Sequence, residues 1–288
     1  MAGLWRDRVR GGSATRKKPI IARPNEDSVL CRAADGLIGV FDGIGMYAQA
    51  RMASTIARQR CTPLLRSVEG TKYKTLDESV MAVSQALLAA QDGVRELQKQ
   101  FPQAGDGGTT AALAKLWQGE DQPQPIAIYV NIGDSRLYHW HHSDNELERL
   151  TTDDNIIRQW REYGFIDADT ADAFSDLIDE YTGSELLPLE VQNAWEQRNT
   201  ICAWLGMPDI SFTLGTTALD LGDRIIAMSD GIHDNLTTDE ITRIVRRKAE
   251  PREIAINLVD VAAAVAAVDI SPRAKPDDMA VAVLILDH

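Results

Sequence analysis

Carboxylates stand at the ends of four apolar runs in this 288-residue chain. Three runs end in an aspartate beside a glycine, and the fourth begins after a pair of aspartates: Asp42 in GVFDG, Asp134 in VNIGDS, Asp230 in IAMSDG, and Asp277-Asp278 before MAVAVLIL. A carboxylate buried at a strand end is costly unless it is paired or bound to a metal. These short motifs offer no basic partner except Arg136. A single Asp-Gly would suggest only a turn, but four such sites predict carboxylates that converge on hard cations.

The residue types favour Mg²⁺ or Mn²⁺ over Zn²⁺, because the chain has no cysteine cluster and no His-x-x-x-His pair. Cys31, Cys61 and Cys202 are far apart, which predicts reduced thiols. His139 and His141 would share one face of a strand, so a metal site there is geometrically possible. An exposed hairpin is the preferred interpretation of that histidine cluster.

Sequence periodicity defines the elements that must position the aspartates. Residues 28–42 predict two strands joined by an Asp-Gly hairpin turn, and apolar residues at steps of three and four from Leu76 to Phe101 predict a long helix. Further strands are expected over 109–117, 125–132, 135–141, 224–230 and 279–286, with another helix around Ile254 to Val265. The most economical packing is an α+β fold, a four-layer α/β/β/α sandwich with two central antiparallel sheets and a helix pair on each outer face.

Two segments depart from this pattern. Residues 1–18 carry six Arg or Lys against one Asp, which predicts a basic flexible leader, with a docking arm as the alternative. Residues from about 153 to 205 are rich in Asp, Glu, Gln and Trp with weak helical periodicity, which predicts an inserted, partly helical lid. Residues 19–288 would then form one domain around this insertion.

Composition limits the partners. Acidic residues outnumber basic ones 43 to 30, and the net charge of −13 disfavours nucleic acid or anionic lipid as the main partner. Neither a secretory signal nor a run of about 18 apolar residues is present, so a cytoplasmic protein is expected. A monomer is expected as well. Neither G-x-x-x-x-G-K-[ST] nor a strand-linked G-x-G-x-x-G occurs, so ATP chemistry is not expected.

The ordered motifs resemble those of the type 2C metal-dependent serine/threonine protein phosphatases, of the bacterial type. The matching blocks span almost the whole chain: RPNEDS, VFDGIG, GDGGTTAAL, VNIGDSRLY, LTTDDN, MSDGIHD and KPDDMAVAVLI. Each block is weak alone, but their order together is specific. The resemblance implies the two-sheet fold described above and hydrolysis of phosphoserine or phosphothreonine in protein substrates, with a role in signalling.

The resemblance also implies the roles of individual residues. Asp42 would bridge two Mn²⁺ or Mg²⁺ ions, the Gly43 carbonyl would be a further ligand, Asp230 and Asp277 would hold one ion, and Glu26 or Asp27 would support the other. A water molecule between the two ions would attack phosphorus without a covalent enzyme intermediate.

Other positions match the family less closely. Arg23 would grip the substrate phosphate, although its spacing to the following acidic residues is one residue shorter than usual. Asp134 and Asp234, with Asp230, would form a third and weaker metal site. Ile44 stands where many eukaryotic relatives have a histidine, and it cannot protonate a leaving alkoxide.

Two alternatives stay open. A noncatalytic relative that binds and regulates a signalling partner is the first, but the presence of Asp42, Asp230 and Asp277 argues against it, since pseudophosphatases usually lose metal ligands. Hydrolysis of a small phosphorylated metabolite is the second, and only the family resemblance argues against it.

Overall fold

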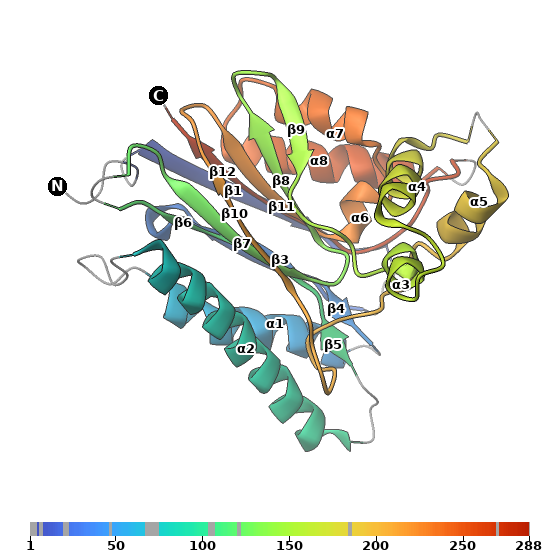
Figure 1. Ribbon diagram of the computed structural model, residues 1–288, viewed down its shortest axis with the longest axis horizontal. Coiled ribbons are helices and arrows are strands. Elements are labelled where there is room, and N and C mark those ends of the chain that lie inside the picture. Colours follow the sequence, from blue (N-terminus) through green and yellow to red (C-terminus); the bar gives the residue numbers. More distant parts are fainter. Residues whose placement is uncertain are drawn as a thin grey trace.

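The computed structural model describes residue 5 and residues 8–19, 23–45, 48–66, 75–102, 107–119, 122–183, 186–268 and 271–287. Two five-stranded antiparallel sheets lie face to face with helices on both outer sides (Figure 1). This arrangement confirms the predicted α/β/β/α sandwich.

The first sheet has the strand order β10-β7-β6-β3-β2. Its strands are β2 (Ser28–Arg32), β3 (Leu37–Phe41), β6 (Ala111–Trp117), β7 (Ile126–Ile132) and β10 (Thr213–Ala218). The second sheet has the order β1-β12-β11-β8-β9. Its strands are β1 (Val9–Arg16), β8 (Arg136–His141), β9 (Glu146–Arg149), β11 (Arg224–Met228) and β12 (Met279–Leu286). A short ribbon of β4 (Gly43–Ile44) and β5 (Gly108–Thr109) follows β3.

A helix pair covers each outer face of the sandwich. Helices α1 (Ala48–Leu65) and α2 (Leu76–Gln100) pack on the first sheet, and α7 (Thr238–Val245) and α8 (Pro251–Ala266) pack on the second. The 25-residue helix α2 begins with a capping box, in which the Glu78 N–H donates to the Thr75 hydroxyl at 3.2 Å. Its apolar stripe is buried against the sheet, as the spacing of three and four predicts.

The inner faces of the sheets meet in a core of mostly small and branched side chains. Ile38 and Val40 of β3 face Ile225 of β11 and Ala282 of β12 across this layer. Strands buried on both faces are apolar at successive positions, and every residue of β12 is buried. These rigid central strands fix the ends at which the acidic residues stand.

Antiparallel pairing brings distant acidic residues to one end of the sandwich. Met228, the last residue of β11, pairs with Val281 near the start of β12 and with Arg136 at the start of β8. Asp230 therefore lies beside the segments that carry Asp134 and Asp277. The convergence predicted from strand ends follows directly from this register.

The expected flexible leader is wrong for residues 9–16, which form β1 and pair with β12 from Val9↔Leu286 to Arg16↔Met279. Residues 1–4, 6 and 7 lie outside the described residues. Strand β1 contains small residues because α8 passes close to it, and a Cβ at Gly12 would stand 2.2 Å from the backbone nitrogen of Arg252. The basic residue Arg16 pairs with Asp260 of α8 at 2.5 Å.

The predicted insertion contains three short helices, α3 (Ile156–Glu162), α4 (Ala168–Glu180) and α5 (Leu189–Glu196). They lie between β9 and β10 in the chain and form a group at one end of the sandwich, near the short helix α6 (Asp230–His233) (Figure 1). Strands β9 and β10 were not predicted. Among the helices of the described residues, none is both long and apolar enough to cross a membrane.

Candidate metal centre

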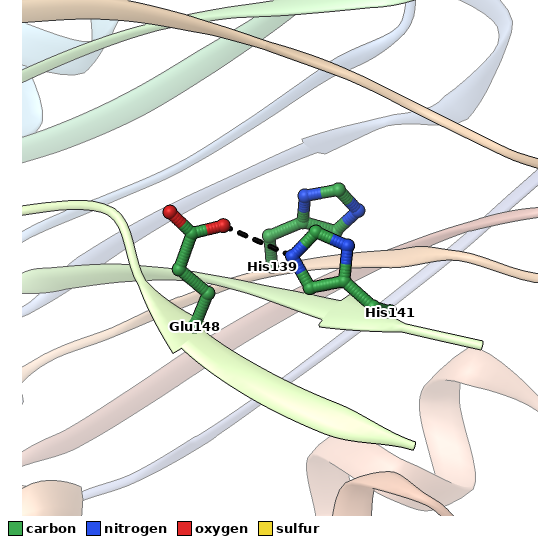
Figure 2. Close-up of side chains that lie close together, drawn as sticks. All are labelled: His139, His141 and Glu148. Atoms are coloured by element: carbon green, nitrogen blue, oxygen red, sulfur yellow. Dashed lines mark hydrogen bonds and ion pairs between the residues drawn. The ribbon is translucent and has the colours of Figure 1, made fainter. Parts of the chain in front are cut away.

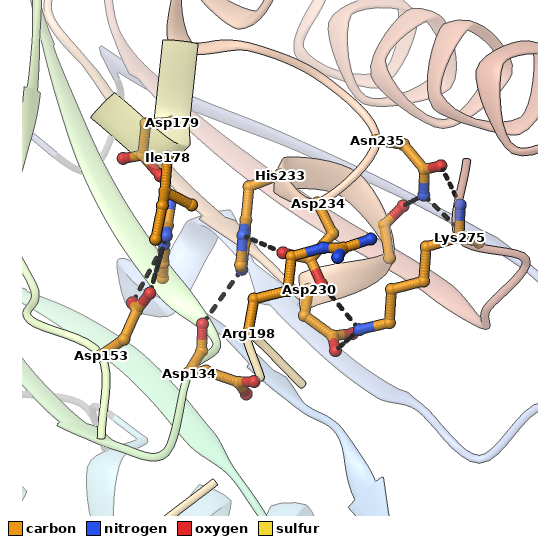
Figure 3. Close-up of polar contacts among 12 residues, drawn as sticks. Asp134, Asp153, Ile178, Asp179, Arg198, Asp230, His233, Asp234, Asn235 and Lys275 are labelled. Atoms are coloured by element: carbon orange, nitrogen blue, oxygen red, sulfur yellow. Dashed lines mark hydrogen bonds and ion pairs between the residues drawn. The ribbon is translucent and has the colours of Figure 1, made fainter. Parts of the chain in front are cut away.

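The predicted ligands come from separate segments and meet at one end of the sandwich. Glu26 and Asp27 precede β2, Asp42 and Gly43 follow Phe41 of β3, Asp134 precedes β8, Asp230 and Asp234 lie on and directly after α6, and Asp277 precedes β12. The charge of Asp42 interacts with the charges of Asp27, Asp230 and Asp277. Figure 3 shows Asp134, Asp230 and Asp234 side by side in this cluster. All the predicted ligands are therefore brought together.

Four buried carboxylate oxygens in this cluster have no hydrogen-bond donor among the described residues. They are Glu26 Oε1, Asp27 Oδ1, Asp134 Oδ1 and Asp230 Oδ1. Buried carboxylate oxygens almost always accept hydrogen bonds or bind cations, because desolvation without compensation is costly. An all-oxygen donor set of this charge fits Mg²⁺ or Mn²⁺.

Burial and mutual repulsion make these carboxylates resist ionisation in the absence of cations. Burial, with the nearby charges of Asp230 and Asp278, raises the pKa of Asp27 well above its usual value. Desolvation and the charges of Asp27 and Asp230 raise the pKa of Asp42 in the same way. Burial and the charge of Asp230 also raise the pKa of Asp134. A cation among these groups would favour their ionised forms.

A lysine that the motif analysis did not single out reaches into the cluster. The Lys275 ammonium donates to Asp230 Oδ2 and to Asp234 Oδ2, the latter at 2.7 Å, and lies 3.7 Å from Asp277 Oδ2 (Figure 3). Burial alone would lower the pKa of Lys275, but the charges of Asp230 and Asp234 outweigh it and raise the pKa well above its usual value. A basic partner for the carboxylates therefore comes from outside the short motifs, in which Arg136 was the one basic residue noted.

A second lysine stands on the other side of the cluster. Lys18 Nζ lies 3.2 Å from Glu26 Oε2 and 3.3 Å from Asp277 Oδ1. Its side chain is 12% exposed, and the chain leads to it directly from β1. Lys18 belongs to the segment that was expected to be a mobile leader, and this position gives that segment a place beside the predicted ligands.

Arg136 does not pair with Asp134, its neighbour in the VNIGDS motif. It forms a bidentate ion pair with Asp153 and a second ion pair with Asp179 of α4, at 2.7 and 3.0 Å. Asp134 instead accepts from His233 Nε2 through its backbone oxygen at 3.0 Å. The other ring nitrogen of His233 lies 3.4 Å from Asp234 Oδ1. His233 thus bridges the loop before β8 to the end of α6.

Backbone segments pass so close to Gly43 and Gly231, which flank the ligands, that a side chain has no room there. A Cβ at Gly43 would stand 2.3 Å from the carbonyl oxygen of Ala50 and 2.8 Å from that of Glu26. A Cβ at Gly231 would stand 2.0 Å from the carbonyl oxygen of Asp278. Any larger residue at either position would push the acidic segments apart.

The backbone of Asp42 is held by the adjacent threonines. Its carbonyl oxygen accepts from the Thr110 N–H and the Thr109 hydroxyl, both at 2.8 Å, and its N–H donates to the Thr110 hydroxyl at 3.0 Å. These threonines therefore orient Asp42.

Side-chain contacts hold the end of helix α4 beside the acidic cluster. Asp179, near the end of α4, accepts from Arg136 of β8. Arg273 donates to the Ile178 carbonyl at 2.9 Å and, with its other terminal nitrogen, to the His233 carbonyl at 2.6 Å. The C-terminal end of α4 is therefore fixed, which limits any lid motion to the rest of the insertion.

The histidine cluster on β8 lies outside this centre (Figure 2). The expectation of an exposed hairpin is wrong for His139, which is fully buried and hydrogen-bonded at both ring nitrogens, to Thr217 at 3.1 Å and Asp223 at 2.8 Å. His141 is partly exposed and contacts Glu148 at 2.9 Å. One ligand atom from each of His139, His141 and Glu148 lies within 4.8 Å of the others. Because both nitrogens of His139 already have partners, its contacts are those of a core histidine.

Sequence comparison assigns the family to which this site belongs. A family model described as Protein phosphatase 2C matches residues 21–257, most of the chain. The chain belongs to the protein phosphatase 2C family. Protein phosphatase PhpP of Streptococcus pneumoniae is 27% identical to this family member over 225 residues, which cover 77% of this chain and 78% of PhpP. Serine/threonine protein phosphatase PstP of Mycobacterium tuberculosis is 26% identical over 251 residues, which cover 87% of this chain and 41% of PstP.

Solved structures of protein phosphatase 2C relatives share the fold. The M. tuberculosis phosphatase PstP/Ppp aligns with a TM-score of 0.71 at 23% identity, covering 97% of this chain and 99% of that chain. A structure of the PstP catalytic domain in complex with two manganese ions aligns with a TM-score of 0.70 at 22% identity, with the same coverage. The predicted fold and family are both confirmed.

Sequence reasoning missed the residues that organise the ligands. Lys18, Lys275, His233 and Asn235 carry no motif signal of their own, although Lys275 and His233 lie inside recognised blocks. A lysine two residues before Asp277 was the one available clue. Arg23 is half-buried three residues before Glu26, and its role as a phosphate clamp stays a prediction.

Proposed function

We propose that this protein phosphatase 2C chain hydrolyses phosphoserine and phosphothreonine in proteins by direct attack of water on phosphorus. The observation that carries the proposal is the group of four buried carboxylate oxygens without a hydrogen-bond donor among the described residues. A purely structural acidic cluster would satisfy these oxygens with its own donors. Relatives named as serine/threonine phosphatases support the choice of substrate.

Two Mn²⁺ or Mg²⁺ ions would be held by Asp42, Gly43 through its carbonyl, Asp230 and Asp277, with support from Glu26 or Asp27. Such ions, when bound, lower the pKa of a coordinated water and offset charge on phosphoryl oxygens. Asp27 is oriented for this task by Ser229, whose hydroxyl donates to Asp27 Oδ2 at 2.8 Å and leaves Oδ1 without a donor.

The chain supplies the remaining chemistry through a few side chains. Arg23 would bind the phosphate with its planar guanidinium, which suits bidentate contact with two oxygens. Ile44 offers no proton to the leaving alkoxide, and His233 is buried with Nε2 on the Asp134 carbonyl. Protonation of the leaving group is therefore assigned to solvent.

The test is turnover of p-nitrophenyl phosphate with and without Mn²⁺, followed by phosphopeptides that carry Ser, Thr or Tyr. We expect Mn²⁺-dependent turnover that EDTA abolishes, with phosphoserine and phosphothreonine peptides preferred over phosphotyrosine. Asp239→Asn serves as a control, because Asp239 is exposed and forms a surface ion pair with Arg243 of its own helix. Absence of any turnover stimulated by Mn²⁺ or Mg²⁺ would falsify the enzyme proposal, and a preference for small phosphate esters over every phosphopeptide would favour a metabolite substrate.

The second candidate is a noncatalytic module that binds a signalling partner. The observation that favours it is the pair of lysines, Lys18 and Lys275, which bring positive charge to the acidic cluster without any metal. Metal binding separates the two candidates. A chain that binds no Mn²⁺ at millimolar concentration, while remaining folded, fits the noncatalytic module.

A further inference from the structure

Lys275 is placed where relatives of this family would hold a third cation. That site was expected from the resemblance to use Asp134, Asp230 and Asp234. The Lys275 ammonium contacts Asp230 and Asp234 directly, with 2.7 Å to Asp234 Oδ2, and interacts electrostatically with Asp134 (Figure 3). Its side chain is 12% exposed, and those of Asp230 and Asp234 are 10% and 12% exposed.

The Lys275 ammonium occupies one of the two carboxylate oxygens of Asp234. Its Oδ2 accepts from Lys275, and its Oδ1 lies 3.4 Å from His233 Nδ1. Asp230 differs, because only its Oδ2 contacts Lys275, whereas Oδ1 is buried without a donor. Asp230 thus keeps one buried oxygen without a donor for the two-metal centre, whereas the Lys275 ammonium already occupies the Oδ2 atoms of both Asp230 and Asp234.

The backbone of Lys275 is locked to the same turn that carries Asp234. The side-chain amide of Asn235 accepts from the Lys275 N–H and donates to the Lys275 carbonyl, both at 2.9 Å. The same amide donates to the Gly231 carbonyl at 2.9 Å, and Asn235 is fully buried. These two hydrogen bonds hold the Lys275 backbone in place, so its ammonium is positioned by the fold and not by electrostatic attraction alone.

From these contacts we infer that the Lys275 ammonium replaces the third metal ion, so that Asp234 serves as the partner of Lys275 and not as a metal ligand. The inference rests on the proposed function, since it concerns the neighbour of the proposed two-metal centre. A dication and a fixed ammonium cannot both occupy the space between Asp230 and Asp234, because their charges repel at short range. The ammonium group of Lys275 would then supply a positive charge at the site in place of a bound metal ion.

The experiment counts bound metal. Metal-free wild type, Lys275→Met and the control Lys248→Met, which removes an exposed lysine far from these contacts, are dialysed against rising Mn²⁺, and bound manganese per chain is measured by mass spectrometry. We expect Lys275→Met to bind one more Mn²⁺ per chain than wild type at the same free concentration, and Lys248→Met to match wild type. The double variant Lys275→Met/Asp234→Asn should lose the extra ion. Equal numbers in wild type and Lys275→Met would overturn the inference.

The wild-type count and the difference between variants answer separate questions. Two ions in wild type support the proposed phosphatase, and no ions contradict it, but the gain of one ion in Lys275→Met decides the role of Lys275 in either case. Should Lys275→Met fail to fold, wild-type crystals soaked in Mn²⁺ give the answer. An anomalous peak between Asp134 and Asp234 would overturn the inference, and its absence, with density for Lys275 Nζ beside Asp234, would support it.

Discussion

The Asp278 carboxylate accepts the backbone N–H of Glu26 at 2.7 Å, although the two residues are 252 positions apart. Its other oxygen accepts the backbone N–H of Lys18, also at 2.7 Å. Both oxygens are thus occupied by main-chain donors, and Asp278 is 2% exposed. Asp278 ties the segment that leads into β2 to the start of β12, a role that needs two acceptor atoms.

Asp278→Ala should weaken this tie and lower stability by about 2–4 kcal/mol, because two backbone N–H groups lose their acceptor. Mn²⁺ affinity should fall as well, since Glu26 is no longer held in place. The measurements are chemical denaturation and calorimetry with Mn²⁺. Asp260→Ala is the matched control, because Asp260 pairs with Arg16 at a half-exposed site and should contribute less than about 1 kcal/mol. Equal losses of stability in the two variants would show that Asp278 does not tie these segments together.

Asp42→Asn should lower kcat by at least about a hundredfold, on the order of 3 kcal/mol, because an amide nitrogen cannot ligate a cation. Without metal the same variant should melt higher than wild type, since it removes one charge that repels Asp27 and Asp230. The value of kcat is measured with saturating Mn²⁺, and the thermal melt is recorded without metal on the same preparation. Near-normal kcat would remove Asp42 from the mechanism.

The metal-free protein should become less stable as pH rises above about 4, the ordinary pKa of aspartate. Burial and neighbouring carboxylates raise the folded-state pKa values of Asp27, Asp42 and Asp134 well above this ordinary value, so the folded state binds more protons than the unfolded state, and that advantage is lost as pH rises through the raised pKa values. Saturating Mn²⁺ should flatten or reverse the slope, because cations bind the ionised carboxylates. Thermal melts in EDTA and in Mn²⁺ test this, and a metal-free melt that rises with pH would contradict it.

Arg23→Ala should chiefly raise KM for phosphosubstrates, since a phosphate clamp that acts in the ground state and the transition state contributes mainly to binding. Mn²⁺ affinity should barely change. Arg23→Lys should recover only part of the loss, because an ammonium cannot make the planar bidentate contact. Kinetics identical to wild type would show that the shortened spacing has removed Arg23 from the site.

The turn between α3 and α4 should affect peptide selectivity more than chemistry. Tyr163 and Phe165 are 67% and 74% exposed there, with ring centroids 6.0 Å apart, and exposed aromatic pairs suit contact with a protein substrate. Replacing both by Ser should alter phosphopeptide KM values while p-nitrophenyl phosphate turnover stays within about tenfold. Asp179→Ala is the contrast, because it removes a partner of buried Arg136 and should lower stability. An equal loss on both substrates in the folded turn variant would count against a lid.

The acidic centre was predictable because its residues stand at strand ends. Asp42, Asp134, Asp230 and Asp277 each adjoin a buried apolar run. Antiparallel pairing brings the last three to one end of the second sheet, and the packing of the two sheets adds Asp42. The lysines were not predictable on this basis. Nothing in the sequence near Lys275 specifies that Asn235, forty residues away, locks its backbone and directs its side chain inward.

The missed strands all lack a continuous run of large apolar residues. The middle of β1 is Gly-Gly-Ser-Ala, where α8 packs closely upon it, so β-branched residues stand only near its ends, at Val9 and Thr15. Strand β10 has the sequence TLGTTA and is only partly buried at the edge of its sheet, and β9 is four residues long. Such strands depend on partners already in place, whereas β12 is apolar throughout and β11 is apolar after Arg224.

The position of β12 has a consequence for synthesis of the chain. This strand lies between β1 and β11 in its sheet, so residues 9–16 have no pairing partner until residues 279–286 have left the ribosome. Asp277 and Asp278 emerge at the same late moment, and the first sheet with α1 and α2 can form long before them. A nascent chain therefore passes through a stage with half of its sandwich built and its acidic cluster incomplete, so that metal binding would have to wait for residues 277–286 and could not guide the early steps of folding.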